Sequence, residues 1–347
     1  MSALSNLLLP AVLFFALGFL ARVIKSDLRI PPDLAKILSI YLLMAIGLHG
    51  GYELAKADLM VALQSIIWAL VLGFAIPIIG YIALVATRRV NPFDAAAITA
   101  HYGSVSAGTF LTAIAYLDSQ QIAYESYPVI MLAVMESPAI IVGLILAARA
   151  RRIVGESTSP ALKVGQPGEG RAAVSIDVDD DDRHGMKGLL REAFTNGSVV
   201  ILIGSMVIGA ISQPNSMEAL FPFIDDIFMG VLCLFLFEMG MVAARRIGDF
   251  RKVGGVLIAF GVLMPIVGGL IGALVGHYML GFSEGGALLV AVLGASASYI
   301  AVPPAMRLAV PEANPSFYLT LSLGITFPFN VVIGIPLYHT FVAYLAV

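Results

Sequence analysis

Small hydroxyl side chains gather in two short stretches of this chain. The stretch GSVSAGT begins at Gly103, and the stretch GASASYIAVPP runs from Gly294 to Pro304. Both lie inside long apolar runs typical of membrane spans, where an interrupted helix is tolerated only beside a cavity within the protein. Pro303 suits the start of a new half-helix, because proline lacks the N–H group that would have no partner there. The two stretches predict two helices broken at mid-membrane, whose half-helix N-termini face one another across a pocket.

Facing helix N-termini favour a bound anion, because their free N–H groups and helix dipoles carry partial positive charge. None of the 20 Lys and Arg residues falls near the middle of a predicted span, so no guanidinium group is placed to bind the carboxylates of a large organic acid. A small monovalent anion fits the pattern better. The predicted substrate-binding residues are Ser104, Val105, Ser106, Ala107, Gly108, Thr109, Ser296, Ala297, Ser298, Tyr299 and Ile300. The alternative interpretation is that these small residues only let helices pack closely.

Anion import also needs a coupled cation, because moving a negative charge into an inside-negative cell costs about 2.3 kcal/mol per 100 mV. A hard cation such as Na⁺ is bound by several oxygen atoms. The candidate ligands for Na⁺ or a proton are Thr109, Glu136, Ser296, Ser298, Thr326 and Asn330. Glu136 is predicted near mid-membrane, where a carboxylate is costly and usually functional. The alternative interpretation is that Glu136 is protonated and makes a structural hydrogen bond. We expect Glu238 to extend towards the inner surface, and His101 to be a packed histidine rather than a ligand.

Ten apolar segments must position these residues, each long enough to cross a bilayer at about 20 residues per span. The composition agrees, with 59% hydrophobic and 12% charged residues, because soluble domains contain about a quarter charged residues. The predicted spans cover residues 4–23, 33–54, 60–86, 93–117, 126–149, 190–212, 226–244, 253–280, 285–309 and 316–345. The only cysteine, Cys233, allows neither a disulfide framework nor a cysteine metal site.

The positive charges are distributed very unevenly about these spans. Lys and Arg accumulate on the cytoplasmic side, and every Lys and Arg except Lys56 lies in a loop, or at the adjoining end of a span, that ten spans would place inside. No Lys or Arg precedes the first span, so that span is not expected to be a cleaved signal peptide. The pattern predicts a multi-pass protein of the inner membrane of the cell, with both termini outside.

A hydrophilic segment at residues 151–187 divides the chain into two five-span halves, residues 1–150 and 188–347. Its Gly, Ser, Pro and Asp content is typical of a flexible linker, and its acidic run at 179–182 is more simply a solvated patch than a cation site. SYPVIMLAVMESPAI, from Ser126, aligns without gaps on SFYLTLSLGITFPFN, from Ser316. Because five is odd, the second copy would be inverted, as in secondary transporters. The predicted fold is therefore an all-α polytopic membrane protein with ten transmembrane helices, arranged as two inverted five-helix repeats.

An intramembrane protease is a remote alternative. GASA resembles the Gly-x-Ser motif of rhomboid-like serine proteases, with Ser296 as nucleophile and His339 as base. His339 would lie roughly 13 Å from Ser296 along the membrane normal, at about 1.5 Å per residue. A nucleophile and its base must be within hydrogen-bond distance, so we do not expect an enzyme.

The chain resembles, from its first span to its last, the SbtA-type sodium-dependent bicarbonate symporter family. The motifs that carry the resemblance are IGLHGG from Ile46, GSVSAGT from Gly103, MESPA from Met135, MGMVAARRIGDFRK from Met239, PPAMRLAVPEANPS from Pro303 and GIPL from Gly334. The resemblance implies bicarbonate and Na⁺ held between two broken helices, alternating access by a transport domain and a scaffold domain, no cofactor, a homotrimer and a PII-like cytoplasmic regulator.

One departure from that family falls at the second break. Its members usually have an Asp-Ile-Ser-Gly-Pro-Pro run where this chain has Tyr299, Ile300, Ala301 and Val302 before the two prolines. The carboxylate and hydroxyl suited to Na⁺ are therefore replaced. Two alternatives stay open at this point: a relative that carries another small monocarboxylate, and one that is coupled to protons.

Overall fold

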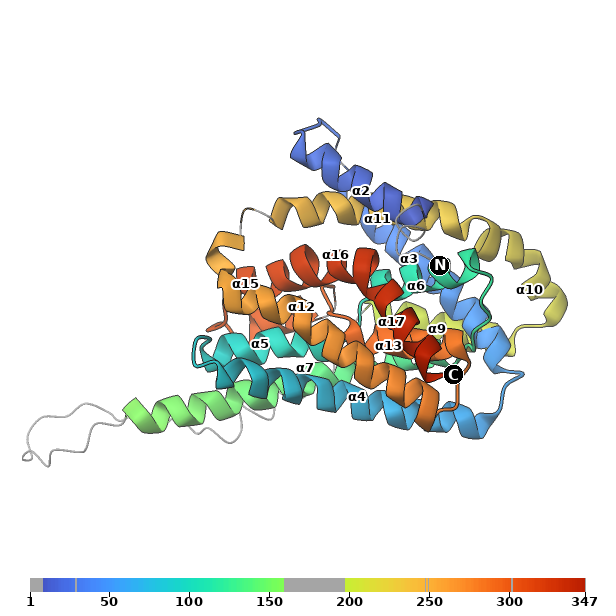
Figure 1. Cartoon of the computed structure of the whole chain (residues 1–347). Coiled ribbons are helices and arrows are strands. Elements are labelled where there is room, and N and C mark those ends of the chain that lie inside the picture. Colours follow the sequence, from blue (N-terminus) through green and yellow to red (C-terminus); the bar gives the residue numbers. More distant parts are fainter. Residues whose placement is uncertain are drawn as a thin grey trace, which may run out of the picture.

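The computed structural model describes residues 9–28, 30–158, 197–246, 248, 250–300 and 302–346 of the 347-residue chain. The elements identified in these ranges are helices (Figure 1). In the first half they are α2 (Pro10–Val23), α3 (Pro32–Leu54), α4 (Leu59–Ala86), α5 (Pro92–Gly103), α6 (Ala107–Ser119) and α7 (Tyr127–Thr158). In the second half they are α9 (Gly197–Ile211), α10 (Pro214–Phe221), η1 (Pro222–Asp226), α11 (Phe228–Arg246), α12 (Phe250–Leu274), η3 (Val275–Met279), α13 (Glu284–Ala295), α14 (Val302–Ala309), α15 (Pro315–Leu319), η4 (Thr320–Thr326), α16 (Phe327–Phe329), η5 (Asn330–Gly334) and α17 (Ile335–Leu345).

Six helical stretches among the described residues are long and apolar enough to cross a membrane. They are Asp33–Leu54, Leu59–Ala86, Tyr127–Ile153, Pro214–Arg246, Val253–Met279 and Pro315–Leu345. Shorter apolar helices cover Pro10–Val23, Val199–Ile211 and Glu284–Ala295. The chain is therefore built as a polytopic membrane protein, while the count of ten spans stays a prediction. The first residues of the segment 151–187 belong to α7, and the acidic run at 179–182 lies outside the described residues.

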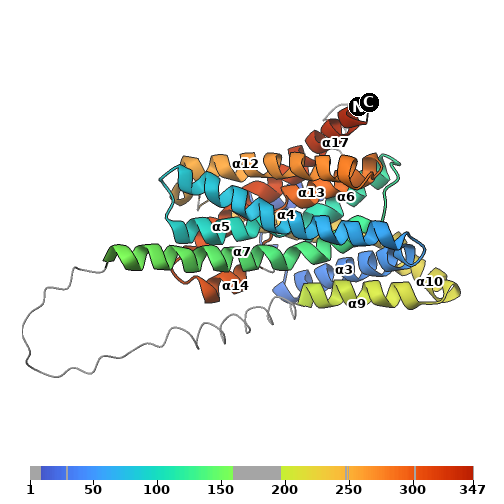
Figure 2. The ribbon, with the colours of Figure 1, turned by 90° about the horizontal axis from the view of Figure 1, so that it is seen from below.

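The first helix group consists of α2, α3 and α9–α11. α2 packs along α11, and α3 packs along α9, which lies beside it in Figure 2. A Cβ on Gly18 would lie 1.9 Å from the carbonyl oxygen of Phe237, and a Cβ on Gly240 would lie 2.1 Å from that of Phe15. The backbones of α2 and α11 therefore touch, which is the small-residue packing that membrane helices favour.

The second helix group consists of α4–α7 and α12–α17. α4 packs on α5 and α7, and α12 packs on α13. Every residue of α13 from Gly285 to Ala295 is buried, and so is every residue of α5 from Asp94 to Gly103. These two helices end at the two stretches of small hydroxyl residues, so the core of this group carries them.

Hydrogen bonds tie the ends of these helices to the opposite half of the chain. Asp94 and Glu284 lie in the first turns of α5 and α13. Asp94 accepts a hydrogen bond from the N–H of Asn314 at 2.7 Å. Near it, Arg151 pairs with Glu312 through Nε and Oε1 at 2.7 Å, and this hydrogen bond lowers the pKa of Glu312. The loop between α14 and α15 is therefore anchored to α5 and α7.

Candidate functional site

The first predicted break lies between α5 and α6. Ser104 has extended backbone angles (φ −95°, ψ 168°), and the next helix begins at Ala107. The Ser106 hydroxyl oxygen accepts hydrogen bonds from the N–H of Thr109 at 3.2 Å and from its hydroxyl at 2.9 Å. A serine in this position stabilises a helix N-terminus by satisfying one of its free donors. The GSVSAGT stretch thus ends one buried helix and starts another.

The second predicted break lies between α13 and α14. Ser296 leaves the helix with extended angles (φ −75°, ψ 159°), and its hydroxyl donates to the carbonyl of Val292 at 2.6 Å. Ser296, Ala297 and Ser298 are buried, and α14 begins at Val302 with Pro303 as its second residue. A helix therefore begins where Pro303 was predicted to start one, while its position at mid-membrane stays a prediction. Ala301 lies outside the described residues.

The two breaks contact one another directly. The N–H of Ser298 donates to the carbonyl of His101, near the end of α5, at 2.8 Å. The hydroxyl of Tyr299 lies against the first turn of α6, because a Cβ added to Gly108 would be 2.5 Å from it. Ser104 is fully buried and its hydroxyl has no hydrogen-bond partner among the described residues. The structure therefore brings the predicted stretches 104–109 and 296–299 together, whereas Ile300 is 41% exposed.

Close backbone contact makes room for this arrangement. A Cβ on Gly294, at the end of α13, would lie 2.3 Å from the carbonyl oxygen of Gly268. A Cβ on Gly268 of α12 would lie 2.0 Å from the carbonyl oxygen of Gly294. Because neither position can hold a larger side chain without moving a backbone, α12 fixes the point at which α13 ends.

His101 is wholly buried beside the contact between the breaks. Its Nδ1 lies 2.7 Å from the carbonyl oxygen of Ala97, which can only accept, so Nδ1 carries the proton. The ring stacks on Tyr318 with 4.4 Å between centroids. Nε2 has no hydrogen-bond partner among the described residues. His101 is therefore packed, as predicted, but only one of its two nitrogens is satisfied.

Two acids within the predicted spans have a buried carboxylate oxygen without a hydrogen-bond partner among the described residues. They are Glu136 of α7 and Glu238 of α11. Gly103, at the end of α5, packs against Ala139 of α7. Glu136 lies one turn before Ala139 on the same helix. Glu238 is 8% exposed and does not extend to the surface, contrary to expectation, because it lines a cavity beside Tyr299.

A family model described as the Na⁺-dependent bicarbonate transporter superfamily matches residues 10–343. This chain belongs to that superfamily. No individual curated protein matches it. Members of the Na⁺-dependent bicarbonate transporter superfamily are transporters, which is consistent with the prediction of a non-enzyme. The superfamily also implies Na⁺ as the coupling ion.

The protease alternative receives no support in this member of the superfamily. The Ser296 hydroxyl bonds to its own helix. His339 has both ring nitrogens engaged elsewhere, with Nε2 2.6 Å from Glu284 and Nδ1 2.7 Å from the hydroxyl of Tyr116. Neither side chain is therefore placed for proton transfer with the other.

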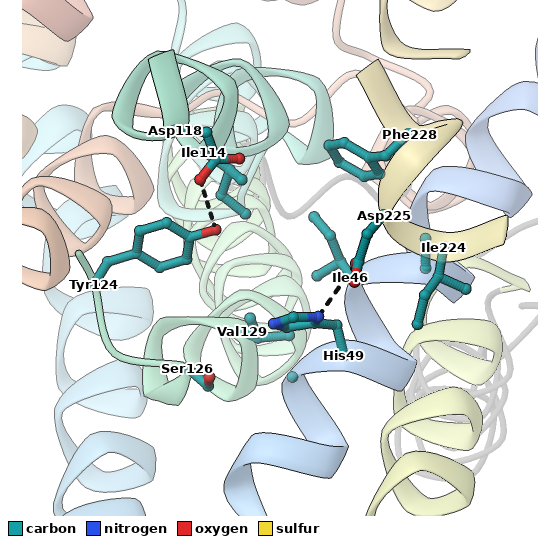
Figure 3. A pocket seen from close by; sticks show the side chains of 12 residues that line it. Ile46, His49, Ile114, Asp118, Tyr124, Ser126, Val129, Ile224, Asp225 and Phe228 are labelled. Atoms are coloured by element: carbon teal, nitrogen blue, oxygen red, sulfur yellow. Dashed lines mark hydrogen bonds and ion pairs between the residues drawn. The ribbon is translucent and has the colours of Figure 1, made fainter. Parts of the chain in front are cut away.

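A second pocket, which sequence reasoning missed, lies between the two helix groups and away from the breaks. It has a volume of about 270 Å³, and Figure 3 shows two polar pairs that line it. Nδ1 of His49 lies 3.3 Å from Asp225 in the first group, and the hydroxyl of Tyr124 donates to Asp118 at 3.3 Å in the second. Burial raises the pKa of Asp118, and the hydrogen bond from Tyr124 opposes that change. One sequence feature could have indicated this pocket: Asp118 and Asp225 both lie at ends of predicted spans on the predicted outer side.

Four of the six predicted cation ligands hydrogen-bond to protein partners: Thr109 and Ser296 near their own breaks, as described above, and Asn330 and Thr326. Asn330 donates from Nδ2 to the carbonyl of Ala295, the last residue of α13, at 2.8 Å. Its Oδ1 accepts a hydrogen bond from the hydroxyl of Tyr338 at 2.9 Å. Thr326 donates to the carbonyl of Gly261 at 2.7 Å. In this arrangement Asn330 holds the end of α13 in place, which is a positioning role.

We expect Asn330→Leu to lower the free energy of unfolding by about 1–3 kcal/mol, because it leaves the buried carbonyl of Ala295 and the hydroxyl of Tyr338 without partners. Thermal unfolding of the purified protein in detergent measures the change. Tyr338→Phe is the matched control, since it removes one of the two bonds and keeps the one to Ala295. Equal stability of Asn330→Leu and wild type would show that the amide does not hold α13.

Proposed function

We propose that this protein is a secondary active transporter that imports bicarbonate together with Na⁺ by alternating access. The observation that carries the proposal is the contact between the breaks, where Ser298 N–H meets the carbonyl of His101 and Tyr299 meets the first turn of α6. Where two helices are interrupted at one buried point, backbone N–H groups are left without partners inside a helix. A small anion can accept hydrogen bonds from them. Membership of the superfamily supports bicarbonate over another monocarboxylate, and Na⁺ over a proton.

In this proposal the anion binds at the N-terminal turn of α6 and beside that of α14. The N–H groups of the first turn of α6, the N–H of Val302 at the start of α14 and the hydroxyls of Ser104, Ser106 and Ser298 donate hydrogen bonds to its oxygens. The Tyr299 hydroxyl already lies against Gly108, so an anion arriving there either displaces it or accepts its hydrogen bond. Thr109, Ser296 and Glu136 are the proposed oxygen donors for the cation. A bound cation offsets the charge of the anion and makes inward transport favourable.

The packing of the first helix group supports two inverted repeats. A repeat of residues 1–150 and 188–347 would relate α2 to α9 and α3 to α11. The symmetry that relates the repeats would place the α2–α11 pair on the α3–α9 pair. The two pairs should then be packed alike, and both are tightly packed. We propose that the first group is the scaffold domain and the second group the transport domain. By resemblance alone, we also propose a homotrimer in the inner membrane and a PII-like regulator on the cytoplasmic side.

Uptake into proteoliposomes tests the proposed function. We expect labelled bicarbonate to accumulate when an inward Na⁺ gradient is applied, and not with a choline gradient. Glu136→Gln should reduce the rate at least about tenfold, equivalent to about 1.4 kcal/mol, because the amide carries no charge to bind the cation. Glu218→Gln, at an exposed position on α10, is the matched control. Uptake driven only by a proton gradient would contradict Na⁺ coupling.

The distribution of positive charge also predicts the topology. Cysteine introduced at Gly168 in the linker should react in intact cells only with membrane-permeant reagents, because Lys and Arg flanking the linker hold it inside. Cysteine introduced at Ser119 should react with impermeant reagents as well. Both variants are made in Cys233→Ser, which removes the single native thiol. The opposite labelling pattern would contradict the placement of both termini outside.

A further inference from the structure

Two helices that meet at the breaks are joined again at their far ends. Tyr116 lies in the last turn of α6, and Glu284 lies in the first turn of α13. His339 of α17 lies between them, with Nδ1 2.7 Å from the hydroxyl of Tyr116 and Nε2 2.6 Å from Oε1 of Glu284. We call these three residues the His339 clamp. Because the hydroxyl of Tyr116 can donate or accept a hydrogen bond, both contacts form whether His339 is neutral or protonated.

The clamp is well separated from the breaks along both helices. Tyr116 follows Ser106 by ten residues, and Glu284 precedes Ala295 by eleven. At about 1.5 Å per residue, each distance is about 15 Å or slightly more. The helix α13 packs on both α6 and α17 (Figures 1 and 2). The three helices therefore lie side by side, with the clamp at one end of α6 and α13 and the breaks at the other.

One helical stretch of the chain holds α13 at both of its ends. Asn330 donates to the carbonyl of Ala295, the last residue of α13, and His339 contacts Glu284 in its first turn. The span from Asn330 to His339 is about 14 Å, and the span from Glu284 to Ala295 is about 16 Å, at about 1.5 Å per residue. These two attachments prevent α13 from sliding along its neighbour. Through Tyr116, the same clamp attaches α6 at a matching point.

The clamp is partly shielded from solvent. Tyr116 is only 8% exposed, and the side chains of His339 and Glu284 are 20% and 40% exposed. Hydrogen bonds in such a partly buried network are stronger than those of a fully exposed pair. Loss of the imidazole would also leave the buried hydroxyl of Tyr116 without this partner, which is costly. The clamp is therefore strong enough to affect how α6 and α13 lie relative to one another.

We propose that His339 is a positioning residue for anion binding, because its clamp sets the gap between the two breaks; this inference rests on the proposed function. His339 does not touch the anion. It acts through α6, whose first turn follows Ser106, and through α13, beyond whose end Ser298 lies. When the clamp opens, the start of α6 moves relative to the end of α13. A donor displaced beyond about 3.5 Å no longer makes a hydrogen bond, so the donors at the two breaks no longer converge on one anion.

Uptake of labelled bicarbonate into proteoliposomes, with an inward Na⁺ gradient, is the first test. His339→Leu should raise the half-saturating bicarbonate concentration about tenfold. His339→Gln is the matched variant, because its amide keeps one N–H donor for Glu284 and one oxygen acceptor for Tyr116. It should stay within about twofold of the wild type. Tyr116→Phe opens only one side of the clamp and should have an intermediate effect.

Backbone hydrogen exchange of the purified protein in detergent, without bicarbonate, is the second test. We expect His339→Leu to speed exchange at residues 104–109 and 296–299 about tenfold, because local opening of the breaks becomes easier. His339→Gln should exchange at these residues like the wild type. Faster exchange confined to the far ends of α6 and α13 would show that the clamp stabilises only its own surroundings, and would overturn the proposal.

The two tests separate this proposal from the proposed function. Wild-type bicarbonate affinity in His339→Leu, or equal loss in His339→Leu and His339→Gln, would overturn the positioning role. If His339→Leu does not fold, Tyr116→Phe decides by the same two measurements, because it removes a single hydroxyl. If the wild type takes up no bicarbonate, the proposed function is refuted, and hydrogen exchange alone decides whether the clamp positions the breaks.

Discussion

Ser298→Leu should reduce anion uptake to background while the protein stays folded. The N–H of Ser298 links the two breaks through His101, and its side chain is buried beside them. A leucine there fills the space in which we place the anion and supplies no hydrogen-bond donor. Core overpacking of this kind costs about 1–3 kcal/mol, which a folded membrane protein tolerates. Uptake and the size-exclusion profile of the purified variant are the two measurements.

Ser106→Leu should have the same effect on uptake for the same reason, with an added cost at the helix start. Loss of the serine that caps α6 costs about 1 kcal/mol, so Ser106→Ala serves as the control that removes the cap without filling the site. Thr340→Leu, at an exposed hydroxyl that bonds to its own helix, controls for the general effect of leucine. Near wild-type affinity for the anion in both Ser106→Leu and Ser298→Leu would mean that the breaks only serve close packing.

The double variant Tyr299→Asp with Ala301→Ser should lower the Na⁺ concentration needed for half-maximal uptake, by about tenfold or 1.4 kcal/mol. The tyrosine supplies a neutral oxygen, because a phenol has a reference pKa near 10, whereas an aspartate supplies a full negative charge to a desolvated cation. The measurement is the Na⁺ dependence of bicarbonate uptake in proteoliposomes.

Tyr299→Asn is the matched control for that variant, because it has the shape of aspartate without the charge. We expect Tyr299→Asn with Ala301→Ser to gain little Na⁺ affinity. If both double variants gain equally, removal of the phenol ring rather than the new charge explains the change. If the wild type already saturates at low millimolar Na⁺ and the aspartate changes nothing, residue 299 does not bind the ion.

Much of the helix framework could be predicted from the sequence. The apolar runs predicted the long helices, because a backbone in lipid must satisfy its own hydrogen bonds. The glycine, serine and proline residues of the two stretches predicted both interruptions, and the structure has α5 end at Gly103 and α13 end at Ala295. These are local properties: the residues that break a helix are part of the helix they break.

Long-range pairing was decided only by the tertiary structure. No sequence pattern indicated that Asn330 bonds to Ala295 or that Tyr338 donates to Asn330, so Asn330 was interpreted as a cation ligand. Glu238 was expected to reach the surface because of its depth in a span, but α3 and α9 line a groove with it. Whether a polar atom is satisfied depends on atoms brought next to it from distant parts of the chain. The sequence by itself thus determined where the helices break, and only the fold decided which of the polar atoms near the breaks found a protein partner.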